Sequence, residues 1–256
     1  MDAGLKELLD RLHDRYNIED FIADDPISVP HRFSDRKDRE IAGFLSASIA
    51  WGNRKSIVRS GHRMMDLMDN QPADFVRNAS EHDLKFVEQF VHRTFNGGDL
   101  RDFILALRRM EEQHDGIGAF FEKRFAETQS VAVCLKDFRE ELLRADHNLH
   151  VEKHISSIAK GAACKRLCMY LKWMVRRDDR GVDFGLWRSI PMSALYIPLD
   201  IHVGEVAREL GLLNRRQNDW KAVEELTATL REAAPEDPVR YDFALFGAGM
   251  DPHCDL

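Results

Sequence analysis

The stretch that decides how this chain is interpreted is SIAKGAACKRLCMYLKWMVRR, residues 157–177. One face of it carries large apolar residues at helical spacing, and these are Leu167, Leu171, Met174 and Val175. Another face carries two lysines and an arginine at positions i, i+4, i+7 and i+11, and its members are Lys165, Met169, Lys172 and Arg176. Taken alone, this second face indicates a solvated basic helix surface. Gly161, four residues before Lys165, allows a tight turn and a close approach by a ligand.

The same helical spacing extends outward over nearly the whole chain. Runs of alternating apolar and polar residues are absent, so we predict an all-α protein without a sheet. Glycines, prolines and capping residues separate the expected helices, with Ser34 or Asp35 capping the second. The predicted helices cover residues 5–16, 36–51, 54–69, 81–92, 99–114, 116–127, 130–145, 151–160, 163–177, 201–211, 219–233 and 237–247.

The composition indicates a globular protein of one large or two small domains. Of 256 residues, 44% are apolar and 32% are charged. No stretch approaches the roughly 18 apolar residues of a membrane span, and the charged first residues do not form a signal peptide. We therefore expect a cytoplasmic protein that does not enter a membrane.

Cysteine and histidine spacing predicts no metal site and no cofactor. The four cysteines include no C-x-x-C pair, so Cys164 and Cys168 are interpreted as core thiols. The spacing of His150 and His154 does not form a convincing ligand set by itself.

Charge is sorted along the chain. The formal net charge of -7 argues mildly against a nucleic-acid partner. Residues 153–180, however, hold eight Lys or Arg against two acids, whereas residues 217–256 hold nine acids against three bases. A chain with this distribution can present one basic face to DNA.

Two further segments could carry chemistry. In YIPLDIHVGEVARELGLL, residues 196–213, Pro198 forces an extended entry and Asp200 is placed as the N-cap of a helix. In EIAGFLSASIAWGNRKSIVRSGHR, residues 40–63, an apolar helix ends at Trp51 and runs into several cations. An aromatic ring beside amides and cations can wedge into a duplex and hold phosphates, although core packing beside a solvated surface explains it equally well.

Together these segments resemble the helix-hairpin-helix DNA glycosylase superfamily, which includes endonuclease III and the 8-oxoguanine glycosylases. Gly161-Ala-Ala-Cys-Lys165 lies across the family's hairpin and catalytic lysine, and Pro198-Leu-Asp200-Ile-His202-Val203 across its later motif. FLSASIAWGN, residues 44–53, is similar to the helix and wedging loop upstream. The order of the three motifs is also that of the family.

The archaeal 8-oxoguanine glycosylase type is the most similar subclass. There too a second lysine follows seven residues after the first, as Lys172 does here, and Asp242-Phe-Ala-Leu-Phe246 resembles a C-terminal element. The whole chain also resembles a sporadic bacterial family with the same KRL…WMVR, PLD-x-H-V and YDFALFG blocks. Ala163 replaces the second hairpin glycine, and Met169 replaces a stacking aromatic residue. The four-cysteine cluster of endonuclease III is missing, so no iron–sulfur centre is expected.

The resemblance implies a helix-hairpin-helix fold of two lobes with a cleft between them, formed by the single unit 1–256. Residues 36–150 would form mainly one lobe, and residues 1–35 with 151–256 the lobe that carries the hairpin and catalytic residues. It further implies a monomer that binds double-stranded DNA containing a damaged base or an abasic site.

The implied reaction is base excision with AP lyase activity, and oxidised guanine is the expected base. Lys165 would attack the sugar C1′ to form a Schiff base, and Asp200 would activate the amine or stabilise the sugar cation. The implied contacts to the flipped base are Met169, Lys172, Asp242 and Phe246. The implied DNA contacts are Trp51, Asn53, Arg54, Lys55, Lys160, Gly161, Arg166 and His202.

Two other interpretations remain open from the sequence. A non-catalytic helix-hairpin-helix module would bind nucleic acid without chemistry, consistent with the acidic total charge and the altered hairpin. An α-helical protein-interaction scaffold would leave the basic segment unexplained.

Overall fold

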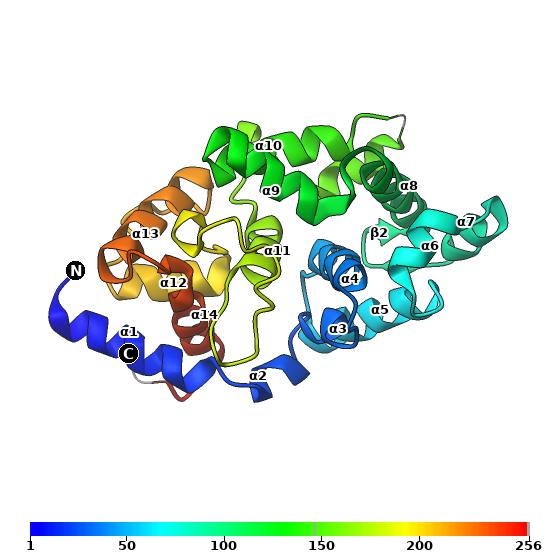
Figure 1. Ribbon diagram of the computed structural model, residues 1–256. Coiled ribbons are helices and arrows are strands. Elements are labelled where there is room, and N and C mark those ends of the chain that lie inside the picture. Colours follow the sequence, from blue (N-terminus) through cyan, green and yellow to red (C-terminus); the bar gives the residue numbers. More distant parts are fainter. Residues whose placement is uncertain (146, 255–256) are drawn as a thin grey trace. The chain divides into compact units, whose positions relative to one another are not determined.

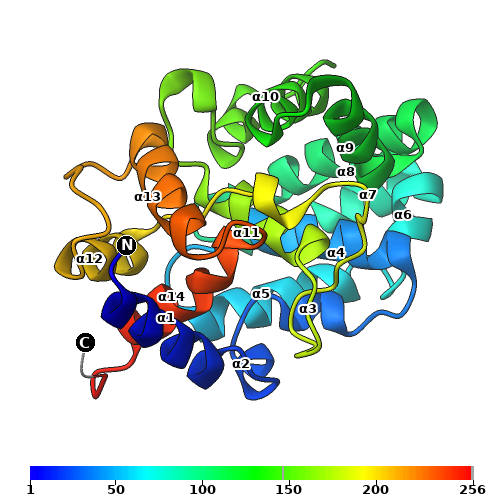
Figure 2. The same ribbon diagram turned by 60° about the vertical axis from the view of Figure 1, so that its left-hand side comes forward.

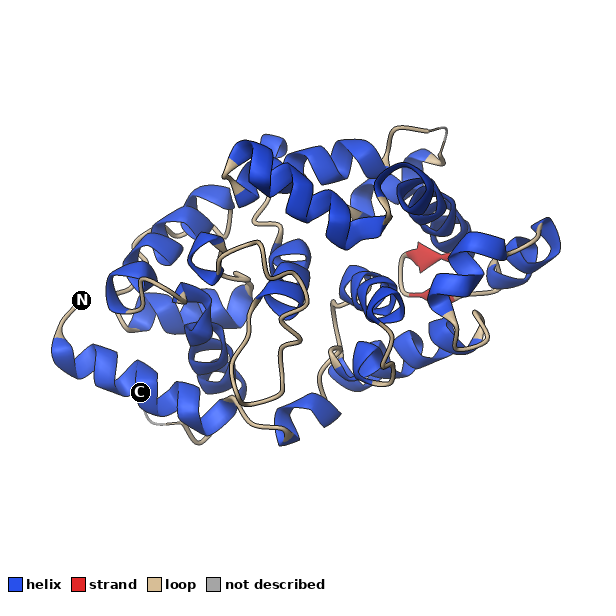
Figure 3. Cartoon of the chain, in the orientation of Figure 1, coloured by secondary structure: helices blue, strands red, loops and turns tan. Residues whose placement is uncertain are grey.

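The computed structural model describes residues 1–145 and 147–254, and most of them are helical (Figure 3). The predicted all-α class is therefore confirmed at that level. One short antiparallel hairpin, β1 (Val91–His92) with β2 (Phe95–Asn96), was not predicted. No helix in the described part of the chain has both the length and the apolar content needed to cross a membrane.

The chain forms two compact units, one of Met1–Phe21 with Ser157–Leu256 and one of Ile22–Ser156. These boundaries differ from the expected ones at 35/36 and 150/151. Residues 22–35 contain a short helix that packs against the next two helices. Residues 149–154 pack against α8 (Gly97–His114), so both segments join the second unit.

The continuous unit is built around aromatic side chains. Phe44, Phe103, Phe121 and Phe138 are almost fully buried, and Phe44 packs against both Phe103 and Phe138. The short α2 (Asp20–Ala23) spans the boundary at which this unit starts. Its further helices are α3 (Ser28–His31), α4 (Arg36–Ser48), α5 (Arg54–Asp66), α6 (Pro72–Asn78), α7 (Glu81–Val87), α8 (Gly97–His114), α9 (Gly116–Thr128), α10 (Val131–Leu142) and the 3₁₀ helix η1 (Leu149–His154).

Side-chain caps explain where several helices of this unit begin. Of the two residues proposed to cap α4, Asp35 does so and accepts hydrogen bonds from two backbone N–H groups. Asn96 and Asp99 form a capping box at the start of α8. The predicted helix 81–92 ends at Val87, because the chain then turns into β1.

The discontinuous unit joins the two ends of the chain. Its α1 (Ala3–Tyr16) lies along α14 (Asp242–Met250), as both views show (Figures 1 and 2). α14 also packs against α12 (Ile201–Glu209). The remaining helices are η2 (Ile158–Lys160), α11 (Lys165–Val175), η3 (Met192–Ala194), α13 (Trp220–Ala233) and η4 (Pro238–Tyr241).

The segment before Lys165 differs from the predicted helix over 151–160. It consists of η1 and η2, which are separated by residues 155–157. Gly161 and Cys164 then adopt left-handed backbone conformations, with φ of 78° and 52°. The Gly161 carbonyl accepts a hydrogen bond from Trp220 N at 3.0 Å, so the turn is fixed against the start of α13. α11 consequently begins at Lys165.

Candidate active site

Lys165 and Asp200 lie together, each at the start of a helix. Lys165 is the first residue of α11, and Asp200 is the N-cap of α12, as predicted. Asp200 Oδ1 accepts a hydrogen bond from Val203 N at 3.0 Å, and Oδ2 lies 3.7 Å from Lys165 Nζ. Both side chains are 24% exposed, so solvent reaches the pair. The amine and carboxylate are therefore close enough to exchange a proton after a small movement.

Two of the predicted base-contacting residues flank Lys165. Its Nζ lies 3.3 Å from Met169 Sδ and 5.9 Å from the centre of the Phe246 ring. The Phe246 ring in turn packs edge-on against Phe21 and His202, with ring centres 6.3 and 6.4 Å apart. The amine is thus bordered by an apolar, polarisable wall on one side and by Asp200 on the other.

The other two, Lys172 and Asp242, form an ion pair in which the Lys172 side chain is buried and the Asp242 side chain is 14% exposed. Lys172 Nζ lies 3.4 Å from Asp242 Oδ2, 3.3 Å from Asp183 Oδ1 and 3.6 Å above the Phe243 ring centre. Its side chain is 3% exposed. A buried ammonium group needs such compensation because it has lost its water. The interpretation as a solvated basic surface is therefore wrong at Lys172.

The same holds for Arg176, one turn further along α11. It is 2% exposed and pairs with Asp178, Asp183 and Asp237 at 2.8 to 3.0 Å. Burial by itself lowers the pKa of Arg176, but the three carboxylates outweigh it and raise the pKa, so the guanidinium group stays ionised. Of the three cations on the predicted stripe, only Lys165 remains partly exposed.

Asp242 has an altered ionisation. Burial raises its pKa to about 6, against the lowering effect of Lys172 and Lys165, while Asp200 and Asp183 add to the increase. The effects of Lys165 and Asp200 show that Asp242 shares their electrostatic environment. A carboxyl group with this pKa can gain or lose a proton near neutral pH.

Of the remaining predicted residues in this unit, Lys160, Gly161 and His202 are exposed and Arg166 is half-buried. A Cβ added at Gly161 would meet no atom within 4 Å, so the turn faces open space. Burial lowers the pKa of Arg166 to about 10. The thiols of Cys164 and Cys168 are buried, as predicted.

The predicted wedge residues lie in the continuous unit and mostly have local structural roles. Asn53 caps α5 by accepting a hydrogen bond from Ser56 N, and Arg54 pairs with Asp25 at 3.3 Å. Lys55 is exposed. Trp51 stacks on His154 with ring centres 5.6 Å apart and packs edge-on against His92.

Sequence reasoning missed two sets of residues that the structure brings together. Asp183, which bridges Lys172 and Arg176, lies in an irregular segment without periodicity. Asp99 contacts both His150 and His154, although 51 residues separate it from His150. For the set of Asp99, His150 and His154, the sequence offered one signal, the spacing of the two histidines. No feature of the sequence pointed to Asp99.

A family model described as "Protein of unknown function (DUF2400)" matches residues 25–251. The chain belongs to this family. No curated protein and no solved structure was found to match this chain. The DUF2400 match spans Lys165, Asp200 and the buried ion pairs around Lys172, so the candidate site lies within the family region.

For this DUF2400 chain, the arrangement offers a defined set of chemical groups. A solvent-accessible primary amine can act as a nucleophile, and the adjacent carboxylate can accept its proton or stabilise a developing cation. The ion pair of Lys172 and Asp242 supplies a donor and an acceptor close by. Such a set suits covalent catalysis at an electrophilic carbon.

Proposed function

We propose that this protein is a DNA glycosylase with AP lyase activity that acts in the cytoplasm on oxidised guanine in duplex DNA. The observation that carries the proposal is the 3.7 Å separation of Lys165 Nζ and Asp200 Oδ2 at the starts of α11 and α12. These are the two residues that the motifs assign to catalysis. Their side chains are equally exposed, so a sugar can approach both.

The chemistry follows from the two groups. The damaged nucleotide must leave the duplex before its C1′ can be attacked, at a cost of a few kcal/mol for unstacking. Asp200 takes a proton from the Lys165 ammonium group, and the free amine attacks C1′ as the base departs with the electron pair of the glycosidic bond. The proton then passes from Asp200 to the departing base, and the carboxylate that this restores stabilises the cationic character of the sugar.

The lyase step follows from the covalent intermediate. Ring opening converts the bond between Lys165 and C1′ into a protonated imine, which acidifies the proton on C2′. Removal of that proton expels the 3′ phosphate by β-elimination and breaks the strand. Water then hydrolyses the imine and releases Lys165.

The base would lie against the groups beside Lys165. Met169 and Phe246 offer apolar surfaces to the faces of a purine. Asp242 can accept a hydrogen bond when ionised and donate one when protonated, and Lys172 keeps it oriented. The amide N7–H and carbonyl O8 of oxidised guanine need one acceptor and one donor.

Borohydride trapping tests the proposal. The protein is incubated with a duplex containing 8-oxoguanine or with one containing an abasic site, and the imine is reduced to a stable adduct. We expect an adduct with both duplexes and none with Lys165→Gln. Asp200→Asn should lower the trapping rate about 100-fold or more. Lys221→Gln, which removes an exposed lysine of the same unit, should match wild type.

The outcome also separates the alternatives. No adduct on either duplex, from folded protein that binds DNA with a steep salt dependence, would favour a non-catalytic binding module. The observation that supports this second candidate is Ala163, which stands where the hairpin motif has its second glycine. Absence of DNA binding would favour a protein-interaction scaffold.

A further inference from the structure

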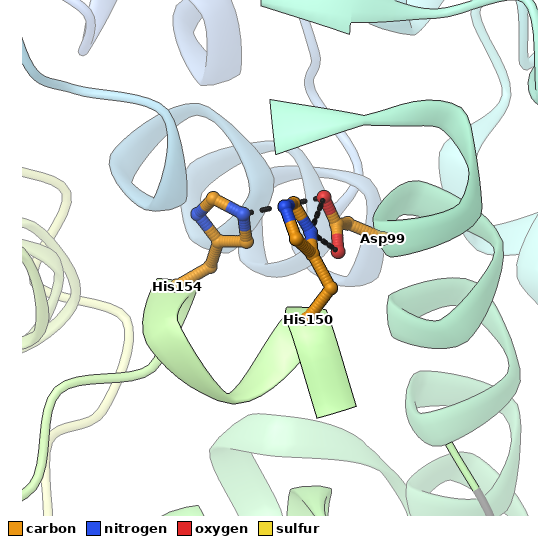
Figure 4. A group of neighbouring side chains, drawn as sticks. All are labelled: Asp99, His150 and His154. Carbon is orange, nitrogen blue, oxygen red and sulfur yellow. Dashed lines mark hydrogen bonds and ion pairs between the residues drawn. The ribbon is translucent and has the colours of Figure 1, made fainter. Parts of the chain in front are cut away.

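A second cluster of reactive side chains lies in the continuous unit, where two histidines of η1 point toward one aspartate of α8 (Figure 4). His150 Nδ1 lies 2.7 and 2.9 Å from the two carboxylate oxygens of Asp99. His154 Nε2 lies 3.2 Å from Asp99 Oδ2. One ligand atom from each of the three residues lies within 4.8 Å of the other two.

Neighbouring groups hold the cluster in place. Asp99 also accepts a hydrogen bond from Asn96 N at 2.9 Å, which fixes its carboxylate at the start of α8. The His154 ring is stacked by Trp51 and contacted edge-on by Phe95, with ring centres 5.6 and 4.9 Å apart. The Asp99 and His154 side chains are 1% and 3% exposed, whereas His150 is 34% exposed. Two members are thus rigidly buried, and the third opens the cluster to solvent.

The atoms and their spacing suit a divalent transition metal. Carboxylate oxygen and imidazole nitrogen bind Zn²⁺ at about 2.0 to 2.2 Å, which places tetrahedral ligand atoms about 3.3 Å apart. The His154–Asp99 separation of 3.2 Å already has this value. The His150–Asp99 separation of 2.7 Å would lengthen by about half an ångström, which a half-exposed side chain permits.

Lys153 affects the hydrogen bonds of His150 that a metal ion would have to replace. Its ammonium group donates to His150 Nε2, so a neutral His150 carries its proton on Nδ1 and donates it to Asp99. A metal on Nδ1 requires that proton to move to Nε2, where Lys153 can no longer donate. Lys153 is exposed and can turn into solvent. Its positive charge nevertheless opposes a cation.

We propose that Asp99, His150 and His154 bind one Zn²⁺-class divalent metal ion, with water as the remaining ligand. Two imidazoles and one carboxylate with an open position form a common zinc ligand set. The bound ion would tie η1 to the first turn of α8. This site goes beyond the proposed glycosylase chemistry and uses none of its residues.

Metal titration of the full-length, chelator-treated protein tests the site. Zn²⁺ binding is measured by calorimetry, and Co²⁺ binding by its visible absorption. We expect one ion per chain, with affinity reduced at least tenfold in Asp99→Asn and in His150→Ala. His62→Ala, which removes a half-exposed histidine outside the cluster, should bind as wild type does. Lys153→Met should bind several-fold more tightly, because it removes both the competing donor and the positive charge.

Several results would overturn the site. One is that wild-type protein binds no Zn²⁺ at about 100 μM. Another is that His150→Ala binds Zn²⁺ as tightly as wild type. Because His150 is half-exposed, this variant should fold and can decide the question even if Asp99→Asn fails to fold. Circular dichroism after chelation checks the fold of each variant. Lys165→Gln should bind metal normally, so failure of the glycosylase proposal and failure of the metal site are distinguishable.

Discussion

At the scale of single residues, burial determines which charges of the candidate site remain available. Lys165 and Lys172 occupy the same face of α11, yet only Lys165 is partly exposed. Lys172 contacts two carboxylates and an aromatic ring, which confines it to positioning Asp242. In the proposed mechanism, the nucleophile and the residue that supports the base pocket are therefore separated by two turns of one helix.

Asp242→Asn tests the altered ionisation of this site. The raised pKa of Asp242, about 6, means that between pH 4 and 6 the folded protein binds more protons than the unfolded chain. This contribution to stability is complete below about pH 4 and is lost as the pH rises through 6, at about 1.4 kcal/mol per unit of pKa shift. The variant lacks it, so its free energy of unfolding should decline less over this range. Urea denaturation at pH 4, 5, 6 and 7 measures the difference.

The control is Asp179→Asn, which removes an exposed carboxylate of the same unit. Its stability curve should run parallel to that of wild type. Parallel curves for Asp242→Asn as well would show that Asp242 does not titrate in this range.

At the scale of elements, the predicted helix starts were accurate where a local cap defines them. Asp35, Asn53 and Asp200 each accept hydrogen bonds from the following turn, a feature that is readable from neighbouring residues. The prediction of a single helix over residues 151–160 was wrong, because the break between η1 and η2 depends on packing against α8 and on the Gly161 contact with α13. The hairpin of β1 and β2 was missed because two-residue strands are too short to show a period.

Gly247→Ala tests how α14 packs against α1. A Cβ at Gly247 would overlap the ring of Tyr16, so the substitution must push the helices apart or move the ring. We expect a loss of about 1 to 3 kcal/mol in the free energy of unfolding, although alanine has the higher helix propensity. Denaturation by urea measures it.

Gly4→Ala in α1 is the matched control. Its added Cβ would lie 3.5 Å from the Asp2 side chain, an ordinary contact, so only the propensity changes. We expect it to stabilise by up to about 1 kcal/mol. If Gly247→Ala were as stable as Gly4→Ala, the result would contradict the close contact between α14 and the Tyr16 ring.

At the scale of the whole chain, part of the sorted charge forms ion pairs inside the fold. Residues 157–180 of the basic segment lie in the discontinuous unit, as does the acidic segment 217–256. There they meet in the pairs Lys172–Asp242 and Arg176–Asp237. Charge sorting along a sequence indicates that opposite charges exist, but only the fold shows whether they face solvent or each other. The motif order could place Lys165 and Asp200 in one site, whereas their ionic surroundings required the structure.

The division into units makes a final prediction about folding. Residues 22–156 are continuous and contain their own aromatic core, so this fragment should fold alone and unfold cooperatively on heating. Residues 157–256 alone should not, because α14 loses α1, which covers much of its apolar surface. Circular dichroism measures the helical content of the two fragments. Mixing the fragment 157–256 with a 1–21 peptide should restore helicity in that fragment. A stable fold of 157–256 alone would show that α1 is dispensable, and an unfolded 22–156 would show that its core depends on the rest of the chain.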